Sequence, residues 1–248
     1  MSGNRLDIAL AKITGLSRTA SQELITSGDV CVNGITTLKP GIQVCPKDRI
    51  DYRLPQVSFV SRGGHKLRAA LEAFNIDLTG QICLDIGSST GGFTHCMLTH
   101  GAALVYALDV GTAQLHPQLR LDTRVVSMEN TNILNIMPHT FCLPPVFAAL
   151  DVSFVSVTKI LPHVATFPEL KNIVVLIKPQ FECGKAALNK RGIVKDEKSR
   201  KQAISAVTAA AVAADLCLVG LQESPLQGGD GNVEYLAHFI STTSQIAI

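Results

Sequence analysis

A glycine-rich turn between an apolar strand and a helix is the most constraining feature of this chain. The run Cys83-Leu-Asp-Ile-Gly-Ser-Ser-Thr-Gly-Gly-Phe93 places Asp85 near the end of the apolar stretch and three glycines after it. Residues 93–98 then have the pattern of a helix. An open α/β sheet binds its ligand at the carboxyl ends of its strands, where such a turn lies. The sequence therefore predicts a ligand crevice at this turn.

The glycine spacing excludes two common nucleotide-binding turns. Ser89 stands where a dinucleotide-binding fingerprint requires its second glycine, and no Gly-Lys-Ser/Thr follows, as a phosphate loop requires. Asp109 ends the next apolar run, residues 104–109. A carboxylate at that position accepts hydrogen bonds from both hydroxyls of a ribose. A nucleoside without a pyrophosphate fits this pattern, and we expect the cofactor to be S-adenosylmethionine.

Strand and helix patterns alternate from residue 60 onward. Apolar runs that predict strands cover residues 81–86, 104–109, 124–128, 146–151, 173–178, 216–222 and 233–240. Helical patterns cover residues 66–74, 92–99, 157–164 and 198–214. Strands interleaved with helices form parallel sheets covered on both faces. We therefore predict an α/β, Rossmann-like fold with a mostly parallel seven-stranded sheet.

The opening of the chain has the composition of a separate, small α+β module. Apolar residues at helical spacing predict a helix over residues 5–12 that Gly15 can end, and Ser17 can cap a second helix over residues 18–27. Residues 30–34 predict a strand entering an Asn-Gly hairpin turn, and residues 48–51 predict another strand. Pro55 interrupts regular structure. We expect domains at residues 1–55 and 61–248, joined by a linker at 56–60.

The composition indicates where the protein is expected to work more clearly than it indicates its function. The net charge of +2 is only mildly basic, so bulk charge is a weak argument for nucleic acid. The seven cysteines are scattered and form no CxxC pair, which favours reduced thiols in a cytoplasmic protein over a disulfide framework or a metal site. The N-terminus lacks the apolar core of a secretory signal. Asp215 interrupts the long apolar stretch 203–221, so we expect no membrane span.

Four charged residues lie beside apolar strands or glycine turns. Asp151 and Lys178 end the apolar runs 146–151 and 173–178, whereas Lys66 and Glu234 follow the glycine-containing segments 61–64 and 228–231. In a doubly wound sheet the carboxyl ends of neighbouring strands meet at the crevice, so Asp151 and Lys178 should converge there. From these residues alone, catalysis and a structural ion pair between Asp151 and Lys178 are equally good interpretations.

The joint pattern resembles known families of RNA-modifying proteins. The Lys-Asp-Lys-Glu set, in this chain order, resembles the ribose 2′-O-methyltransferases of the FtsJ type. The N-terminal module is similar to the S4-type (α-L) RNA-binding domain, through Arg5-Leu-Asp7, Ser17-Arg18, Ala20, Ile25, Gly28 and Val30-x-Val-Asn-Gly34. The full chain resembles the TlyA family of rRNA methyltransferases, often labelled haemolysin-like. The motifs are Ser61-Arg-Gly-Gly, Asp85-Ile-Gly-Ser-Ser-Thr-Gly-Gly-Phe93, Asp109-Val-Gly111, Asp151-Val-Ser-Phe154, Lys178-Pro-Gln-Phe-Glu182 and Gly231-Asn-x-Glu234.

The resemblance implies a methyltransferase that acts on a ribose 2′-hydroxyl of ribosomal RNA or ribosomal subunits, with no obligate protein partner. Because that hydroxyl is a weak acid, a base must take its proton as it attacks the methyl group. Lysine can act as this base when burial and neighbouring cations favour its neutral form. We assign Lys178 as the base and Lys66 as the neighbouring cation. Asp151 would orient the lysines, and Glu234 would bind Lys66 or the ribose.

The expected binding residues follow from the same motifs. For the cofactor they are Asp85, Gly87, Ser88, Ser89, Thr90, Gly91, Gly92, Phe93, Asp109, Val110, Glu129, Asn130 and Asp151. For Asn130 and Asn132 a turn-capping role is an equally good interpretation. For RNA the candidates are the basic residues Arg5, Lys12, Arg18, Lys39, Arg49 and Arg62, with Lys185, Lys190 and Arg191 on a mobile basic loop. Solvated surface charge is the simpler interpretation of several of these residues.

Other functions are less consistent with the sequence. Exocyclic amino methylation typically uses an Asp/Asn-Pro-Pro-aromatic motif, and residues 151–154 contain no proline. Carbon-5 pyrimidine methylation requires a cysteine nucleophile, typically after a proline, and the chain has no Pro-Cys dipeptide. Two alternatives stay open: a haemolysin or cytolysin, and an RNA-binding protein whose methyltransferase domain is inactive.

Overall fold

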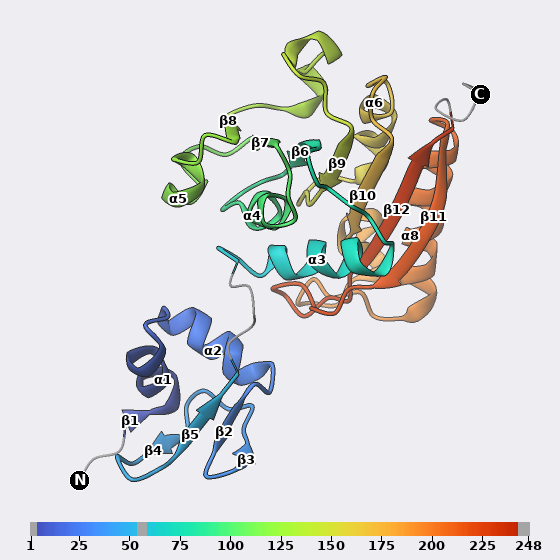
Figure 1. The fold of residues 1–248 in the computed structure, drawn as a ribbon. Coiled ribbons are helices and arrows are strands. Elements are labelled where there is room, and N and C mark those ends of the chain that lie inside the picture. Colours follow the sequence, from blue (N-terminus) through green and yellow to red (C-terminus); the bar gives the residue numbers. More distant parts are fainter. Residues whose placement is uncertain (1–3, 54–58, 243–248) are drawn as a thin grey trace. The chain divides into compact units, whose positions relative to one another are not determined.

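The structure is a computed structural model that describes residues 4–53 and 59–242. The chain divides into two compact units, an N-terminal unit of residues 1–58 and a C-terminal unit of residues 59–248 (Figure 1). Residues 56–58 of the expected linker lie outside the described residues, and Phe59 is buried in the C-terminal unit.

Two short helices and two small sheets form the N-terminal unit. The helices are α1 (Leu6–Thr14) and α2 (Arg18–Thr26). One sheet pairs β1 (Asn4–Arg5) with β4 (Gln43–Val44), and the other has the order β3 (Ile35–Thr36), β2 (Val30–Val32), β5 (Ile50–Tyr52). The apolar sides of these elements share one core, formed by Leu6, Leu10, Leu24, Ile25, Val30 and Val44.

The ends of these elements follow the sequence signals. Gly15 ends α1 in the left-handed conformation, with φ of 75°. Ser17 caps α2, because its side chain accepts a hydrogen bond from the Ala20 amide at 3.2 Å. Asn33 and Gly34 both have positive φ, as the two-residue hairpin between β2 and β3 requires. The predicted caps and hairpin of this unit are thus confirmed.

A seven-stranded sheet organises the C-terminal unit. Its spatial order is β11-β12-β10-β9-β6-β7-β8. The strands are β6 (Ile82–Ile86), β7 (Leu104–Leu108), β8 (Val125–Met128), β9 (Phe147–Leu150), β10 (Asn172–Ile177), β11 (Leu216–Glu223) and β12 (Tyr235–Ser241). Only β12 runs against the other six strands of this described sheet, since it is antiparallel to both β10 and β11. The predicted mostly parallel, Rossmann-like fold is confirmed.

Helices cover both faces of the sheet (Figure 1). The longer ones are α3 (Gly63–Ala73), α4 (Gly92–Thr99) and α8 (Glu197–Val212), and single turns are α5 (Pro117–Arg120), α6 (Leu161–Val164) and α7 (Pro179–Glu182). The 3₁₀ turns are η1 (Ile133–Asn135), η2 (Pro138–Thr140), η3 (Val157–Lys159) and η4 (Lys185–Ala187). None of the helices described is long and apolar enough to span a membrane.

The largest differences from the predicted helices concern α3 and residues 157–164. Helix α3 begins at Gly63, three residues before the predicted start. The predicted helix over residues 157–164 is divided into η3 and α6. Pro162 explains the division, because it has no amide hydrogen to donate to the carbonyl of residue 158 in a continuous helix.

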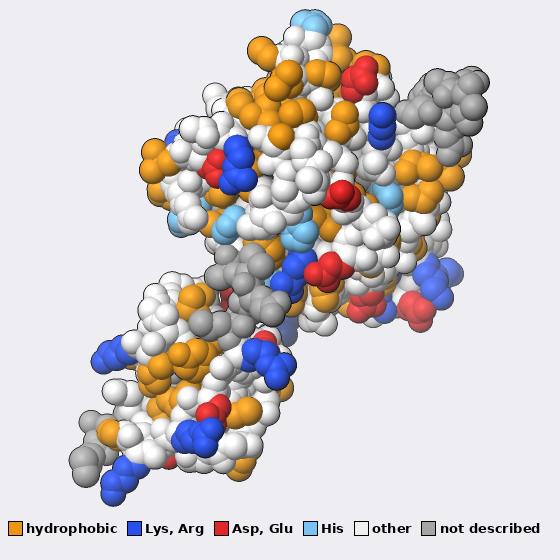
Figure 2. Space-filling view, viewed as in Figure 1, with side chains coloured by type: hydrophobic (Ala, Val, Ile, Leu, Met, Phe, Trp, Pro, Cys, Tyr) orange, Lys and Arg blue, Asp and Glu red, His pale blue; other side chains and the backbone are white. Residues whose placement is uncertain are grey.

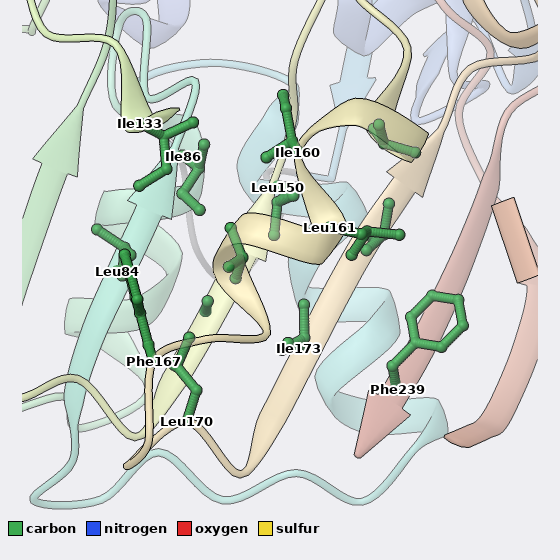
Figure 3. Close-up of a cluster of buried hydrophobic side chains, with 14 of the residues drawn as sticks. Leu84, Ile86, Ile133, Leu150, Ile160, Leu161, Phe167, Leu170, Ile173 and Phe239 are labelled. Carbon is green, nitrogen blue, oxygen red and sulfur yellow. The ribbon is translucent and has the colours of Figure 1, made fainter. Parts of the chain in front are cut away.

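One hydrophobic cluster fixes the sheet to its helices. Alternate strand residues such as Leu84, Leu150 and Ile173 point to the face that α6 and α8 cover, where Leu161 packs on them (Figure 3). Since side chains alternate between faces, Asp85 points to the opposite face, where α4 lies. This alternation places one carboxylate of β6 under the glycine-rich turn.

Candidate active site

Four neighbouring strands end in charged residues at one edge of the sheet. Asp85 lies one residue before the end of β6, and Asp109, Asp151 and Lys178 directly follow β7, β9 and β10. These strands are parallel and adjacent, so their carboxyl ends share one edge. Ligands of open α/β sheets bind at this edge.

The glycine-rich turn lies directly against the segment that follows β9. Gly87 has a φ of 86°, and a Cβ there would lie 2.5 Å from the backbone oxygen of Asp151. Only glycine combines this left-handed conformation with so close an approach. The missing side chain therefore lets the turn pack directly against the residues that follow β9.

Unpartnered polar atoms lie under the turn. Asp85 is fully buried; its Oδ2 accepts a hydrogen bond from Thr94 Oγ1 at 2.6 Å, while its Oδ1 has no partner among the described residues. Ser88 Oγ is likewise buried without a described partner. Burial, reinforced by the charge of Asp151, raises the pKa of Asp85 to about 7. Buried polar atoms without partners are rare, and a polar ligand would satisfy them. The methionine end of S-adenosylmethionine fits this requirement.

Asp109 joins the turn to the next strand. Its Oδ2 accepts a hydrogen bond from the Ser89 amide at 2.8 Å, and its Oδ1 accepts one from the Gly111 amide at 2.7 Å. Each carboxylate oxygen can accept more than one hydrogen bond, so both can still receive ribose hydroxyls. Val110 beside it is 69% exposed and offers an apolar surface at the sheet edge.

Glu129 and Asn130 lie in the connection that follows β8. The Glu129 carboxylate accepts hydrogen bonds from the Leu115 and Gln114 amides, at 3.1 and 2.6 Å, and pairs with Arg120 at 2.8 Å. The two amides hold the pKa of Glu129 below its usual range. Asn130 occupies a turn with a φ of 53°. Contact of these two residues with the adenine stays a prediction. The capping role is found at Asn132, which accepts a hydrogen bond from the Leu134 amide at the start of η1.

The four charged residues of the predicted catalytic set form two ion pairs. Lys178 Nζ lies 2.7 Å from Asp151 Oδ1 and donates a hydrogen bond to Ser153 Oγ at 2.8 Å. Lys66 Nζ lies 2.5 Å from Glu234 Oε2. The Lys66 and Lys178 side chains are only 10% and 12% exposed. Buried ammonium groups require such partners, because an unpaired charge is costly away from water.

Strand register and helix packing bring the two pairs to the same end of the sheet. Strands β12 and β10 are antiparallel, and Tyr235, the first residue of β12, lies opposite Ile177, the last residue of β10. Glu234 precedes Tyr235 and Lys178 follows Ile177, so both residues lie at the same end of the sheet. Helix α3 carries Lys66 and begins next to Asp151, since a Cβ on Gly63 would lie 3.7 Å from Asp151 Oδ2. Both ion pairs therefore lie beside the glycine-rich turn.

An exposed aromatic residue that was not among the predicted site residues lies beside this set. Phe154 is 92% exposed and has a φ of 65°, a conformation that is uncommon for a bulky residue. Its ring lies 5.3 Å from that of Phe181, between centroids, and Phe181 follows Lys178 in α7. The available signal was an aromatic residue three positions after Asp151, directly after polar Ser153.

Some of the candidate RNA-binding residues form ion pairs within the N-terminal unit. Arg5 and Arg18 both contact the buried carboxylate of Asp7, so part of their charge is engaged within the N-terminal unit. Figure 2 shows Lys and Arg side chains at separate places on the visible face of this unit. The other candidates are exposed, namely Lys12, Lys39, Arg49, Arg62, Lys185, Lys190 and Arg191.

The basic loop of residues 184–196 is fastened to the segment that carries Glu234. Asn232 is 1% exposed, accepts a hydrogen bond from the Val194 amide at 2.9 Å and donates one to the Gly192 carbonyl at 3.1 Å. Leu188 and Val194 form an antiparallel bridge within the loop. The basic side chains thus extend from a braced loop near one of the two ion pairs.

The sheet order, the single reversed strand of this sheet and the glycine-rich turn at the strand ends define an S-adenosylmethionine-dependent methyltransferase fold. Residues 59–240 match the FtsJ-like methyltransferase family, and residues 4–50 match the S4 domain. The chain belongs to the FtsJ-like methyltransferase family and carries an S4 domain at its N-terminus.

Individual relatives extend over nearly the whole chain. Hemolysin A of Brachyspira hyodysenteriae is 43% identical over 229 residues, which cover 90% of this chain and 94% of that protein. The 16S/23S rRNA (cytidine-2′-O)-methyltransferase TlyA of Mycobacterium tuberculosis is 41% identical over 235 residues, 93% of this chain and 87% of that protein. A solved structure of a hemolysin-named protein from Streptococcus thermophilus is 40% identical, with a TM-score of 0.74, and covers 98% of this chain and 90% of its own. The expected resemblance to the TlyA family is confirmed.

Proposed function

We propose that this protein transfers the methyl group of S-adenosylmethionine to a ribose 2′-hydroxyl of ribosomal RNA. The observation that carries the proposal is the pair of buried lysine–carboxylate contacts at the strand ends, Lys178 with Asp151 and Lys66 with Glu234. A ribose hydroxyl needs a base, and this set offers an amine that two neighbouring groups hold in place. The relative from M. tuberculosis that is named for this reaction supports the assignment.

The residues divide the chemical work among themselves. S-adenosylmethionine supplies a methyl group on a positively charged sulfur. Lys178 accepts the proton of the ribose hydroxyl, while Asp151 and Ser153 fix the direction of its amine. Lys66 places a second ammonium group at the same end of the sheet. Glu234 holds Lys66 there, and Asp85 and Asp109 bind the methionine and ribose ends of the cofactor.

The surface around the four charged residues can bind an RNA nucleotide whose base is not stacked within a helix. RNA-binding proteins stack single-stranded bases on aromatic side chains and bind phosphates with basic ones. The exposed ring of Phe154, which packs against the half-buried ring of Phe181, provides aromatic surface next to Lys178. The exposed Lys185, Lys190 and Arg191 of the loop and the S4 domain provide the basic groups. We therefore assign ribosomal RNA or ribosomal subunits in the cytoplasm as the substrate.

The proposal is tested with labelled methyl donor, purified ribosomal subunits and single-residue variants. The wild-type protein is expected to label ribosomal RNA, and Lys178→Ala to lose at least about 100-fold of the rate, because general-base catalysis contributes about 10²–10⁴-fold. Lys171→Ala is the matched control: Lys171 is exposed and directly precedes β10, at the opposite end from Lys178. This control is expected to retain the wild-type rate.

Binding measurements separate a catalytic loss from an unfolded or unbound protein. Lys178→Ala is expected to bind S-adenosylmethionine and RNA with wild-type affinity, since neither ligand depends on this amine alone. If Lys178→Ala methylates ribosomal RNA at the wild-type rate, Lys178 is not the base. If the wild-type protein binds the cofactor and RNA yet labels nothing, the protein acts as an RNA-binding module.

A further inference from the structure

Two motif segments run side by side and are joined along their whole length. Residues 151–157 follow β9, and residues 178–182 follow the neighbouring strand β10. Asp151 and Ser153 contact Lys178 at 2.7 and 2.8 Å, and the Phe154 and Phe181 ring centroids are 5.3 Å apart. Beyond Lys178 and the two rings, the pairing continues to Ser156, Val157 and Glu182, which have no role in the proposed reaction.

Glu182 makes the last contacts between the two segments. Its Oε2 accepts a hydrogen bond from Ser156 Oγ at 2.5 Å, and its Oε1 accepts one from the Val157 amide at 2.9 Å. The side chain is half-buried, and its removal from water raises the pKa of Glu182. The Glu182 carboxylate thus joins the end of α7 to the start of η3.

The segment between the two anchors contains a strained residue. Phe154 has a φ of 65°, and such a conformation persists only where the surrounding structure imposes it. On one side Asp151 and Ser153 are held by Lys178, and on the other side Ser156 is held by Glu182. Release of the Glu182 anchor would let the segment relax and move Ser153 and Asp151 away from the lysine.

We propose that Glu182 is a positioning residue for methyl transfer, which fixes residues 151–157 so that Asp151 and Ser153 direct the Lys178 amine. This inference rests on the proposed function, because it acts through the proposed base. Displacement of a reacting group by about 1 Å costs about 10²-fold in rate. Glu182 therefore affects the turnover number more than cofactor binding, because the contacts of Asp85 and Asp109 at the glycine-rich turn lie outside residues 151–157.

The test compares Glu182→Ala, Glu182→Gln and the control Glu169→Ala, an exposed glutamate of the same unit. Glu182→Ala is expected to lower kcat by about 10- to 100-fold, with the KM for S-adenosylmethionine nearly unchanged. Glu182→Gln is expected to restore most of kcat, because its amide oxygen accepts from the Val157 amide and its NH₂ group donates to Ser156 Oγ. Glu169→Ala is expected to match the wild type.

Amide exchange over residues 152–158 provides a readout that does not require activity. Glu182→Ala is expected to exchange these amides faster than the wild type, and the Gln variant is not. Wild-type kcat or unchanged exchange in Glu182→Ala would overturn the inference. So would equal losses of kcat and cofactor affinity that Gln does not rescue, which indicate a general structural role. A wild-type protein that labels no ribosomal RNA refutes the proposed function instead, and the exchange comparison then still decides whether Glu182 anchors the segment.

Discussion

Asp85→Asn is predicted to make the protein more stable at neutral pH while it weakens the cofactor site. Asp85 is fully buried, receives one hydrogen bond from Thr94 and has one oxygen without a described partner. Burial raises its pKa from 3.8 to about 7, so the folded protein keeps a proton that the unfolded chain has already lost. The stability that this carboxyl contributes is therefore complete below pH 4 and is lost as the pH rises through 7.

The magnitude follows from the two pKa values. At 1.36 kcal/mol for each pH unit between 3.8 and about 7, the loss is about 4 kcal/mol in total. About 3 kcal/mol of this loss falls between pH 5 and pH 8. The asparagine side chain of the variant is neutral at every pH and keeps the shape of the aspartate. The difference in unfolding free energy between Asp85→Asn and the wild type should therefore increase by about 3 kcal/mol over this range.

Urea unfolding at several pH values, followed by circular dichroism for the transition of the C-terminal unit, measures this difference. Asp77→Asn is the matched control: the Thr79 amide holds the pKa of the exposed Asp77 below its usual value of 3.8, so Asp77 is ionised in both the folded and the unfolded chain between pH 5 and pH 8, and this variant should give a curve parallel to that of the wild type. Parallel stability curves for Asp85→Asn and the wild type between pH 5 and pH 8 would refute the reasoning. Weaker binding of S-adenosylmethionine by Asp85→Asn, measured by calorimetry, would show that the site retains a destabilising group for its function.

Three further changes have outcomes that the structure predicts. Gly87→Ala should weaken S-adenosylmethionine binding by at least about 10-fold in calorimetry, because the left-handed conformation costs about 1–2 kcal/mol and the new methyl group meets the backbone after β9; unchanged affinity would contradict the proposed crevice. Asp7→Ala should lower the unfolding free energy of the N-terminal unit by about 2 kcal/mol in urea, since it leaves two arginines and a glutamine without their buried partner; an equal effect on the C-terminal unit would contradict this. The triple variant Lys185→Ala, Lys190→Ala and Arg191→Ala removes three basic charges from the loop. The slope of the logarithm of its binding constant for single-stranded RNA against the logarithm of the salt concentration should be smaller by about 2 than that of the wild type. An unchanged slope would exclude the loop from the interface.

Local signals were sufficient to predict the strand ends of the site. An apolar run followed by one charged residue marks the point where a buried strand reaches solvent, and Asp109, Asp151 and Lys178 all lie at such points. Their convergence follows from parallel neighbouring strands alone. The bounds of α4 were also predictable, because the glycine turn that opens it and the apolar residues within it are local features.

Contacts between distant segments were not predictable from such signals. Lys66 and Glu234 are 168 residues apart, and only the family resemblance suggested that they belong together. Helix α3 begins at Gly63 although glycine is a poor helix former. The start of α3 packs closely against the start of α4, since a Cβ on Gly92 would lie 2.9 Å from the Gly64 amide nitrogen, and the sequence of neither helix shows this contact. The left-handed backbone of Phe154 likewise depends on contacts made outside its own segment.

The chemical identity of the methylated product tests the central claim most directly. Ribosomal RNA labelled by the wild-type protein is hydrolysed in alkali, which requires a free 2′-hydroxyl at each cleaved linkage. The account predicts that the label is found in an alkali-stable dinucleotide, because a 2′-O-methyl group blocks cleavage beside it. Label recovered in mononucleotides would place the methyl group on a base and contradict a lysine that acts on a ribose hydroxyl.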